Sequence, residues 1–157
     1  MKINVLFLGK TKQSFVSDGE GEYLKRLKKY LSVKVNVLPD PKNASRLSNE
    51  ELKRAEGEII LKNLDAGTVL VLLDENGAEF TSREFANWIQ KRINAGPKSI
   101  TFVVGGAYGF SEEVYKMAAF KVSLSRMTFS HQMVRMIFLE QLYRAFSILN
   151  NEPYHHD

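Results

Sequence analysis

Two runs of this chain contain almost no polar side chain. Residues 69–73 (Val-Leu-Val-Leu-Leu) and 100–104 (Ile-Thr-Phe-Val-Val) have the composition of central strands covered on both faces, whereas a sheet with one wet face would alternate apolar and polar residues. Three other short runs are also rich in branched side chains. The sequence therefore predicts five strands, at residues 3–8, 33–38, 68–73, 99–104 and 121–124.

The segments between these runs have the spacing of amphipathic helices. In residues 23–31 the apolar side chains fall on one helical face and basic side chains on the other. Two capping boxes, Ser48 with Glu51 and Thr81 with Glu84, mark helix starts. The alternation of strands and helices predicts an α/β fold, with a mostly parallel sheet of about five strands covered by helices.

The composition narrows the class of protein. With 157 residues, 44% of them hydrophobic, the chain can bury a core without metal or disulfide staples, so we expect one domain over residues 1–157. The absence of cysteine excludes disulfides, thiolate zinc sites and cysteine nucleophiles, and it fits a reducing, cytoplasmic location. No apolar run approaches the roughly 18 residues of a membrane span, so we expect no membrane partner.

The formal net charge is +4. This charge favours a polyanionic partner, because clustered lysines and arginines gain affinity for nucleic acid by releasing condensed counterions. The bias is mild, since many proteins with such a charge bind no nucleic acid.

Polar or glycine-rich loops follow two neighbouring strands and precede a third unusual segment. Asp74-Glu75-Asn76-Gly77 follows one apolar run, and Gly105-Gly106-Ala107-Tyr108-Gly109 follows the other. Because the carboxyl ends of parallel strands meet at one edge of a sheet, both loops point to one ligand crevice. Residues 124–129 add small, hydroxyl-bearing and apolar side chains that could wrap an adenine. The glycine turn alone is equally consistent with a tight strand-to-helix connection that has no ligand. Residues 124–129 alone would usually be a loop that packs its apolar side chains into the core.

The sequence of the glycine turn favours a ligand without phosphates. It lacks the Gly-Lys-Ser/Thr ending of a P-loop, and it does not follow the first strand as the dinucleotide fingerprint does. Glu112 and Glu113, at the start of the helix that follows, would repel a phosphate at that helix end.

Side-chain catalysis has little support in this sequence. There is no Gly-x-Ser-x-Gly elbow, and His155 and His156 are adjacent rather than spaced as metal ligands, so we expect no metal. A soluble cofactor that carries the transferred group fits this sparse chemistry, because it needs only orientation and electrostatics from the protein.

Two pairs of residues near the carboxyl terminus are candidates for binding a substrate. His131 and Arg135 are four apart and could share a helical face toward an anion, although a helix-terminal histidine and a surface arginine would look the same. Tyr154 offers a face for stacking a base, and the imidazole of His155 could accept a proton near neutral pH. The alternative for this second pair is a frayed tail.

The last predicted helix, residues 131–150, carries apolar side chains around most of its circumference. A helix of this kind is buried on several sides. Because one small core could cover only part of it, we expect a subunit interface in a homodimer. The alternative is a central core helix of a monomer.

Several ordered segments closely resemble the RlmH family over essentially the whole chain. They are residues 73–77 (Leu-Asp-Glu-Asn-Gly), 104–109 (Val-Gly-Gly-Ala-Tyr-Gly), 123–131 (Ser-Leu-Ser-Arg-Met-Thr-Phe-Ser-His), 140–145 (Glu-Gln-Leu-Tyr-Arg-Ala) and the Pro-Tyr-His at 153–155. The family comprises SPOUT-class methyltransferases that use S-adenosyl-L-methionine to methylate N3 of a pseudouridine in 23S ribosomal RNA. The resemblance implies a homodimer whose C-terminal segment forms a trefoil knot, which sequence reasoning alone would have excluded.

The resemblance also implies roles for particular residues. The cofactor pocket would comprise Leu73, Gly105, Leu124, Ser125, Arg126, Met127, Thr128 and Phe129. The tail would face the RNA, with His155 as candidate base and Tyr154 as a substrate-binding residue, and it could complete the pocket of the neighbouring subunit. His131 and Arg135 stay candidate substrate-binding residues on the ground of their spacing. The family usually has Lys or Arg where this chain has His156, which weakens a phosphate contact there.

The resemblance also bears on the target. Arg126, Arg135 or Lys98 could stabilise the anion that develops on the pseudouridine ring or bind phosphates of the RNA, and their spacing does not rank them. We expect recognition of an assembled ribosomal surface, with basic helix faces such as residues 25–29 on the RNA backbone. The alternatives are a methyltransferase of the same fold acting on another RNA such as tRNA, and a non-catalytic RNA-binding module.

Overall fold

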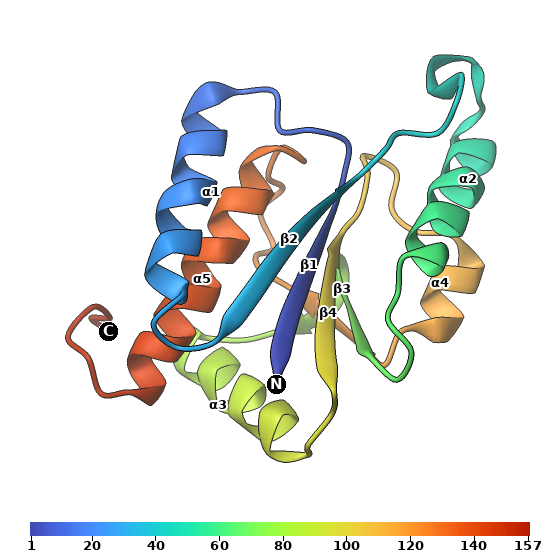
Figure 1. Cartoon of the computed structure of the whole chain (residues 1–157). Coiled ribbons are helices and arrows are strands. Elements are labelled where there is room, and N and C mark those ends of the chain that lie inside the picture. The colour runs from blue at the N-terminus through green and yellow to red at the C-terminus, as the bar shows by residue number, and fades with distance from the viewer.

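A parallel five-stranded sheet forms the centre of the computed structural model, which describes all residues 1–157 (Figure 1). The strands lie in the order β2-β1-β4-β3-β5, and every neighbouring pair is parallel. Their bounds are β1 Lys2–Leu8, β2 Ser32–Leu38, β3 Val69–Glu79, β4 Ser99–Val104 and β5 Phe120–Ser123. The predicted α/β fold with a parallel sheet is confirmed.

β3 continues beyond its predicted end at Leu73. Leu73 and Ala78 both pair with Val122 of β5, so the four residues between them bulge out of the ladder. Gly77 is required in this bulge, because a Cβ atom there would lie 2.6 Å from the carbonyl carbon of Lys121. The bulge therefore places a short polar loop at the edge of the sheet where the strands end.

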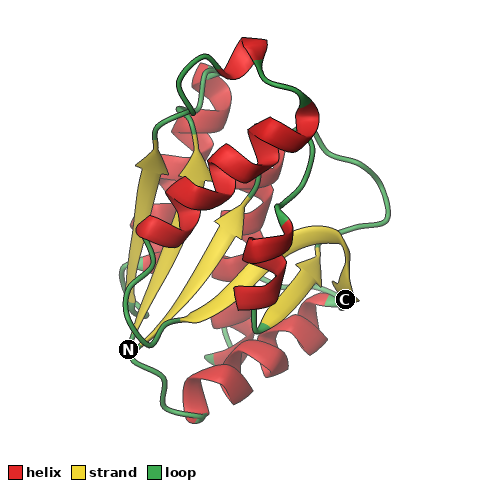
Figure 2. Ribbon diagram, turned by 90° about the vertical axis from the view of Figure 1, so that its right-hand side faces the viewer, coloured by secondary structure: helices red, strands yellow, loops and turns green.

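Helices cover both faces of the sheet (Figure 2). One face is covered by α1, α3 and α5, and the other by α2 and α4. Their bounds are α1 Ser14–Leu27, α2 Asn49–Lys62, α3 Ser82–Asn94, α4 Glu112–Met117 and α5 Met133–Leu149, with a short 3₁₀ turn η1 at Ala44–Arg46. No helix is both long and apolar enough to cross a membrane.

The two predicted capping boxes differ in the structure. Thr81 and Glu84 form a complete box, in which each side chain accepts the backbone N–H of the other. At the start of α2 the hydroxyl of Ser48 accepts the N–H of Glu51, but the Glu51 carboxylate accepts from that hydroxyl rather than from the backbone. Both helices begin where the sequence predicts.

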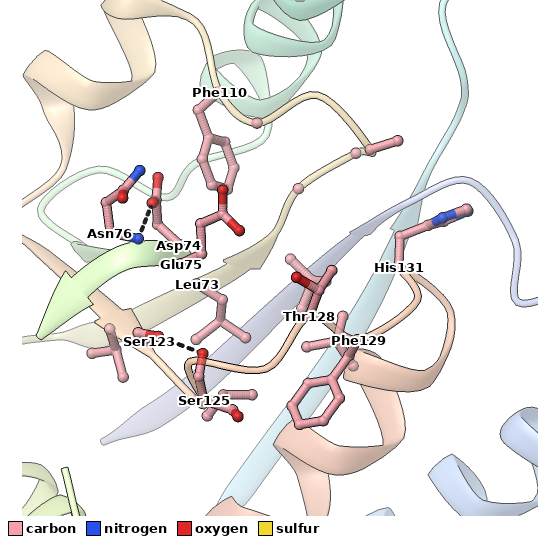
Figure 3. A pocket seen from close by; sticks show the side chains of 18 of the residues that line it. Leu73, Asp74, Glu75, Asn76, Phe110, Ser123, Ser125, Thr128, Phe129 and His131 are labelled. Atoms are coloured by element: carbon pink, nitrogen blue, oxygen red, sulfur yellow. Dashed lines mark hydrogen bonds between the residues drawn. The ribbon is translucent and has the colours of Figure 1, made fainter. Parts of the chain in front are cut away.

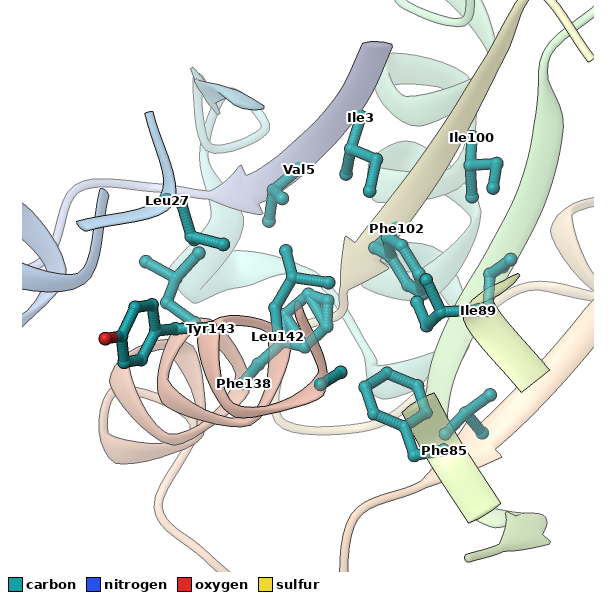
Figure 4. Packing of buried hydrophobic residues seen from close by; sticks show 14 of the residues in the cluster. Ile3, Val5, Leu27, Phe85, Ile89, Ile100, Phe102, Phe138, Leu142 and Tyr143 are labelled. Carbon is teal, nitrogen blue, oxygen red and sulfur yellow. The ribbon is translucent and has the colours of Figure 1, made fainter. Parts of the chain in front are cut away.

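The larger part of the core lies between the sheet and α5 (Figure 4). The rings of Phe102 in β4 and Phe138 in α5 are 4.8 Å apart, and Phe138, Leu139 and Leu142 are fully buried. Residues of α5 contact both α1 and α3, and every residue of α5 is at least partly buried. The single chain thus buries one side of this helix and leaves residues such as Val134 and Ile148 partly exposed, so the homodimer stays a prediction.

Candidate functional site

Three loops at the carboxyl end of the sheet enclose a cavity of about 540 Å³. They are residues 73–76 in the bulge of β3, residues 104–110 after β4, and residues 122–131 from β5 toward α5. Figure 3 shows side chains of all three loops around one space. The structure thus brings together the three segments that the sequence points to, although they come from separate strand ends.

Seven of the eight predicted cofactor residues line this cavity. They are Leu73, Gly105, Leu124, Ser125, Met127, Thr128 and Phe129. Arg126 does not line it, because its side chain is 86% exposed and its Nε donates to Glu79 Oε2 at 2.9 Å. Arg126 therefore marks the outer, solvent-facing side of the loop.

The first wall is held by Asp74. Its Oδ1 accepts the backbone N–H of Asn76 at 2.8 Å, and its Oδ2 accepts the hydroxyl of Tyr115 in α4. Burial and the Asp74 carboxylate raise the pKa of Tyr115 to about 12, so this phenol stays a donor at neutral pH. Sequence reasoning missed Tyr115, although its position one turn into the helix after the glycine loop was a usable signal.

The second wall is the glycine loop. A Cβ atom on Gly105 would lie 2.8 Å from the Phe110 ring, and one on Gly106 would lie 2.7 Å from the Glu56 carboxylate. The loop therefore packs against its own chain on one side and lines the cavity on the other. Glu56, in α2, is 7% exposed and its Oε1 has no hydrogen-bond partner. Burial, with a smaller contribution from Asp40, raises the pKa of Glu56 to about 7.

The third wall is shaped by serine side chains. Ser123 Oγ donates to the carbonyl oxygen of Ser125 at 3.1 Å, and Ser125 Oγ accepts the N–H of Met127 at 2.9 Å. Ser130 Oγ accepts the N–H of Met133 at 3.0 Å, at the start of α5. These local bonds turn the backbone without helix or sheet, and Met127 is left 78% exposed beside the cavity.

The charge of the lining limits what the cavity can bind. Asp74 and Glu75 contribute carboxylates, no lysine or arginine lines the space, and His131 is the one histidine there. The carboxylate of Glu75 forms no ion pair and points toward the centre of the space in Figure 3. A cationic ligand is favoured and a phosphate is disfavoured. No three His, Cys, Asp or Glu side chains are grouped so that they could hold a metal ion.

Arg135 is not brought to the cavity. α5 begins at Met133, so His131 lies in a turn outside the helix and the four-residue spacing does not put the two side chains on one face. Arg135 is 2% exposed. It donates from Nη1 to the carbonyl oxygen of Gly9 at 2.9 Å and from Nη2 to that of Leu8 at 2.6 Å. In the structure it anchors the end of β1.

The C-terminal tail lies at the other end of α5. Val134, at the start of this helix, lines the cavity, and the 17 residues of α5 span about 25 Å. Tyr154 donates to Glu140 Oε1 at 3.0 Å, and burial raises its pKa. His155 Nδ1 is 3.1 Å from Arg144 Nη1, and its Nε2 is 2.8 Å from Asp157 Oδ1.

Two further predicted residues also lie outside the cavity. His156 is exposed. Lys98 directly precedes β4, at the amino end of the sheet and thus opposite the cavity. Neither Lys98 nor the tail reaches the cavity of its own chain.

Comparison with known proteins finds close relatives over the whole chain. A family described as "Predicted SPOUT methyltransferase" matches residues 1–155. A ribosomal RNA large subunit methyltransferase H from Parabacteroides distasonis is 54% identical over 157 residues, which is 100% of both chains. The protein of the same name from Flavobacterium johnsoniae is 51% identical over 156 residues, 99% of each chain.

A solved structure shares the fold. The structure of a probable methylase family protein from Haemophilus influenzae Rd KW20 superposes with a TM-score of 0.54 at 15% identity. The match covers 95% of this chain and 66% of that chain.

Proposed function

This chain belongs to the SPOUT methyltransferase family, and from that premise we propose that it methylates N3 of a pseudouridine in 23S ribosomal RNA with S-adenosyl-L-methionine as the donor. Relatives at 54% and 50% identity over the full chain carry the name ribosomal RNA large subunit methyltransferase H. Family membership implies a methyl donor. The identity of the donor and of the target atom is the proposal.

The charge of the cavity is the observation that carries the choice of donor. S-adenosyl-L-methionine has a sulfonium, an ammonium and a carboxylate, hence a net positive charge and no phosphate. The lining has two carboxylates and no lysine or arginine, so it complements this molecule and would repel a dinucleotide. A volume of about 540 Å³ lies in the range of small-molecule sites.

The residues that would hold the donor are those of the three loops. The turn around Ser125 would offer backbone groups and apolar contacts to an adenine, together with Leu73 and Gly105. Glu75 would face the cationic part of the donor. When bound, the donor supplies a methyl group on sulfur that is reactive without further activation, so the protein has to align the acceptor and help it lose a proton.

The tail is proposed to serve the cavity of a second subunit. Within one chain the length of α5 separates Tyr154 and His155 from the cavity. A homodimer with a two-fold axis would bring each tail to the other chain's cavity. Tyr154 would then stack on a base and His131 would meet the substrate from the cavity's own chain. The trefoil knot implied by the family belongs to the same proposal.

His155 is the proposed base, and its contacts set a condition for that role. If Arg144 donates to Nδ1, then Nε2 carries the proton and donates it to Asp157. Neither ring nitrogen is then free to accept a proton. His155 can act as a base only after RNA binding displaces Arg144 from Nδ1, because loss of the Asp157 contact would still leave Nε2 protonated.

The target is proposed to be presented by assembled ribosomes in the cytoplasm. The chain forms one sheet with its covering helices, which we take as a single domain over residues 1–157 without a separate RNA-binding module. A single small domain offers few contacts to RNA, and recognition of a preformed RNA shape would compensate for this.

In the test, the protein and isotope-labelled S-adenosyl-L-methionine are incubated in three separate reactions with ribosomes, with naked rRNA and with tRNA. Methylated nucleosides are then mapped by mass spectrometry. We expect label in N3-methylpseudouridine from ribosomes, with less on naked rRNA. Label in tRNA would contradict the proposed target, and donor binding without transfer to any RNA would indicate a non-catalytic module. Equal transfer to naked rRNA and ribosomes would contradict the ribosomal context.

A further inference from the structure

The connection between β1 and α1, residues 9–13, is tied to the segment that follows the cavity. Arg135 holds the carbonyl oxygens at the end of β1, and the side chain of Gln132, 9% exposed, accepts the backbone N–H of Lys12 at 2.7 Å. Both anchors follow His131, which lines the cavity, by one and four positions. The connection therefore has a fixed place relative to the cavity.

Holding this connection requires a buried charge. The Arg135 guanidinium lies 4.8 Å from the centre of the Phe7 ring, and burial lowers its pKa. Taking a guanidinium out of water is costly unless its hydrogen bonds are well made. A third bond runs from Nη1 to Thr11 Oγ1 at 3.1 Å, and that hydroxyl donates to Glu20 at 2.8 Å. The buried Nε of Arg135 has no partner, so Nη1 and Nη2 make all the hydrogen bonds by which this side chain holds the connection. The backbone of the connection is thus preorganised.

The connection presents two lysines to solvent, one on each side of Thr11. Lys10 and Lys12 are exposed, and neither forms an ion pair. The neighbouring connection after β2 adds two more exposed cations without ion pairs, Lys42 and Arg46.

The two connections meet at the carboxyl end of the sheet, the end that holds the cavity. The N–H of Gly9 donates to the carbonyl oxygen of Leu38 at 2.8 Å, and a Cβ atom on Gly9 would lie 2.8 Å from the carboxylate of Asp40. Asp40 and Glu20, which accepts from Thr11, are thus the acidic side chains in contact with this connection, and the four exposed cations outnumber them.

Building on the proposed function, we propose that Lys10 and Lys12 bind the phosphate backbone of ribosomal RNA beside the nucleotide that enters the cavity. Phosphate contacts carry no sequence information, but they fix the position of a nucleic acid on a protein. Because the connection is held by the residues next to His131, a phosphate bound there lies at a set distance from the cavity. This surface, rather than a helix face alone, aligns the target.

The basic residues of α1 are less suited to this task. Arg26 is paired with Glu22 at 2.9 Å and Lys29 with Glu152 at 2.8 Å, so two of the four cations expected to contact RNA are already neutralised. Arg26 lies in the last turn of α1 and Lys29 follows the end of this helix, so both are far along the chain from the connection that precedes it.

The experiment compares the double variant Lys10→Ala/Lys12→Ala with a matched control, Lys62→Ala/Lys91→Ala. The control lysines are also exposed and without ion pairs, but they lie in the last turns of α2 and α3, which lead to β3 and β4 at the amino end of the sheet. Binding of each protein to purified ribosomes is measured by co-sedimentation between 50 and 200 mM KCl, and affinity for S-adenosyl-L-methionine by calorimetry.

We expect the Lys10/Lys12 variant to bind ribosomes about tenfold more weakly and to reduce the slope of log affinity against log salt by about two, with donor affinity unchanged. The control should match the wild type in all three measurements. Wild-type slope and affinity in the Lys10/Lys12 variant would overturn the inference while leaving the proposed function intact. A wild-type protein that binds no ribosomes would overturn both.

Discussion

Replacing Glu56 with glutamine is expected to stabilise the fold above neutral pH. The carboxyl group is buried against the glycine loop, and one of its oxygens has no hydrogen-bond partner. Burial and repulsion from Asp40 raise its pKa from the ordinary 4.5 to about 7. The folded protein therefore favours the neutral carboxyl group, whereas the unfolded chain ionises it in weak acid.

The size and the sign of the effect follow from these two values. Below pH 4.5 the carboxyl group is largely protonated in both states and has little effect on stability. Between pH 4.5 and about 7 the unfolded chain loses the proton first, so stability falls as pH rises, and it levels off above that range. At about 1.4 kcal/mol per pH unit the full loss is about 3 kcal/mol. Glutamine cannot ionise and removes this loss.

The assay is urea unfolding at pH 5, 6, 7 and 8 with equal protein concentrations. The advantage of Glu56→Gln over the wild type should grow from about 1 kcal/mol or less at pH 5 to about 3 kcal/mol at pH 8. Glu58→Gln is the matched control, because Glu58 lies on the same helix but is exposed, and it should stay within about 0.5 kcal/mol of the wild type. A difference between Glu56→Gln and the wild type that does not change with pH would refute the reasoning.

Three further substitutions test other parts of the structure. His155→Ala should slow single-turnover methylation by at least about 100-fold near neutral pH with donor affinity unchanged, and an unchanged rate would exclude His155 as the base. Gly77→Ala should weaken donor binding measured by calorimetry by about tenfold or more, because its Cβ would lie 2.6 Å from the Lys121 backbone; wild-type affinity would show that the bulge can relax. Phe138→Ala should lower the free energy of unfolding in urea by about 3 to 5 kcal/mol, and a loss below about 1 kcal/mol would contradict its fully buried place.

The sheet could be predicted because strands that are buried on both faces consist almost entirely of apolar residues. All six residues of β4 are buried, as their near-continuous apolar character indicates. The bulge in β3 could not be predicted, because polar residues after Leu73 resemble a strand end. Only pairing with Val122, about 50 residues later, restarts the ladder, and that partner is not visible in a local pattern.

The site shows the same division between local and distant causes. The three loops could be found because each carries unusual residues at a strand end, whereas the places of Arg135 and Tyr115 depend on tertiary contacts. Arg135 donates to the carbonyl groups of Gly9, directly after β1, and of Leu8, at its end, which lie 126 and 127 positions earlier. Tyr115 bonds to Asp74, 41 positions earlier. The apolarity of α5 indicates burial, but it does not reveal whether α1 and α3 or a second subunit provides the cover.

The strand order also governs when this protein can fold during its synthesis. β1 pairs with β2 on one side and β4 on the other, and β3 pairs only with β4 and β5. Until residue 104 leaves the ribosome, the nascent chain therefore holds a two-stranded piece and a separate third strand that cannot join. At about 5 to 20 residues per second this lasts on the order of several seconds after β1 emerges. β4 joins the two parts of the sheet, because it pairs with both β1 and β3. The cavity can therefore form only when the final third of the chain is being translated.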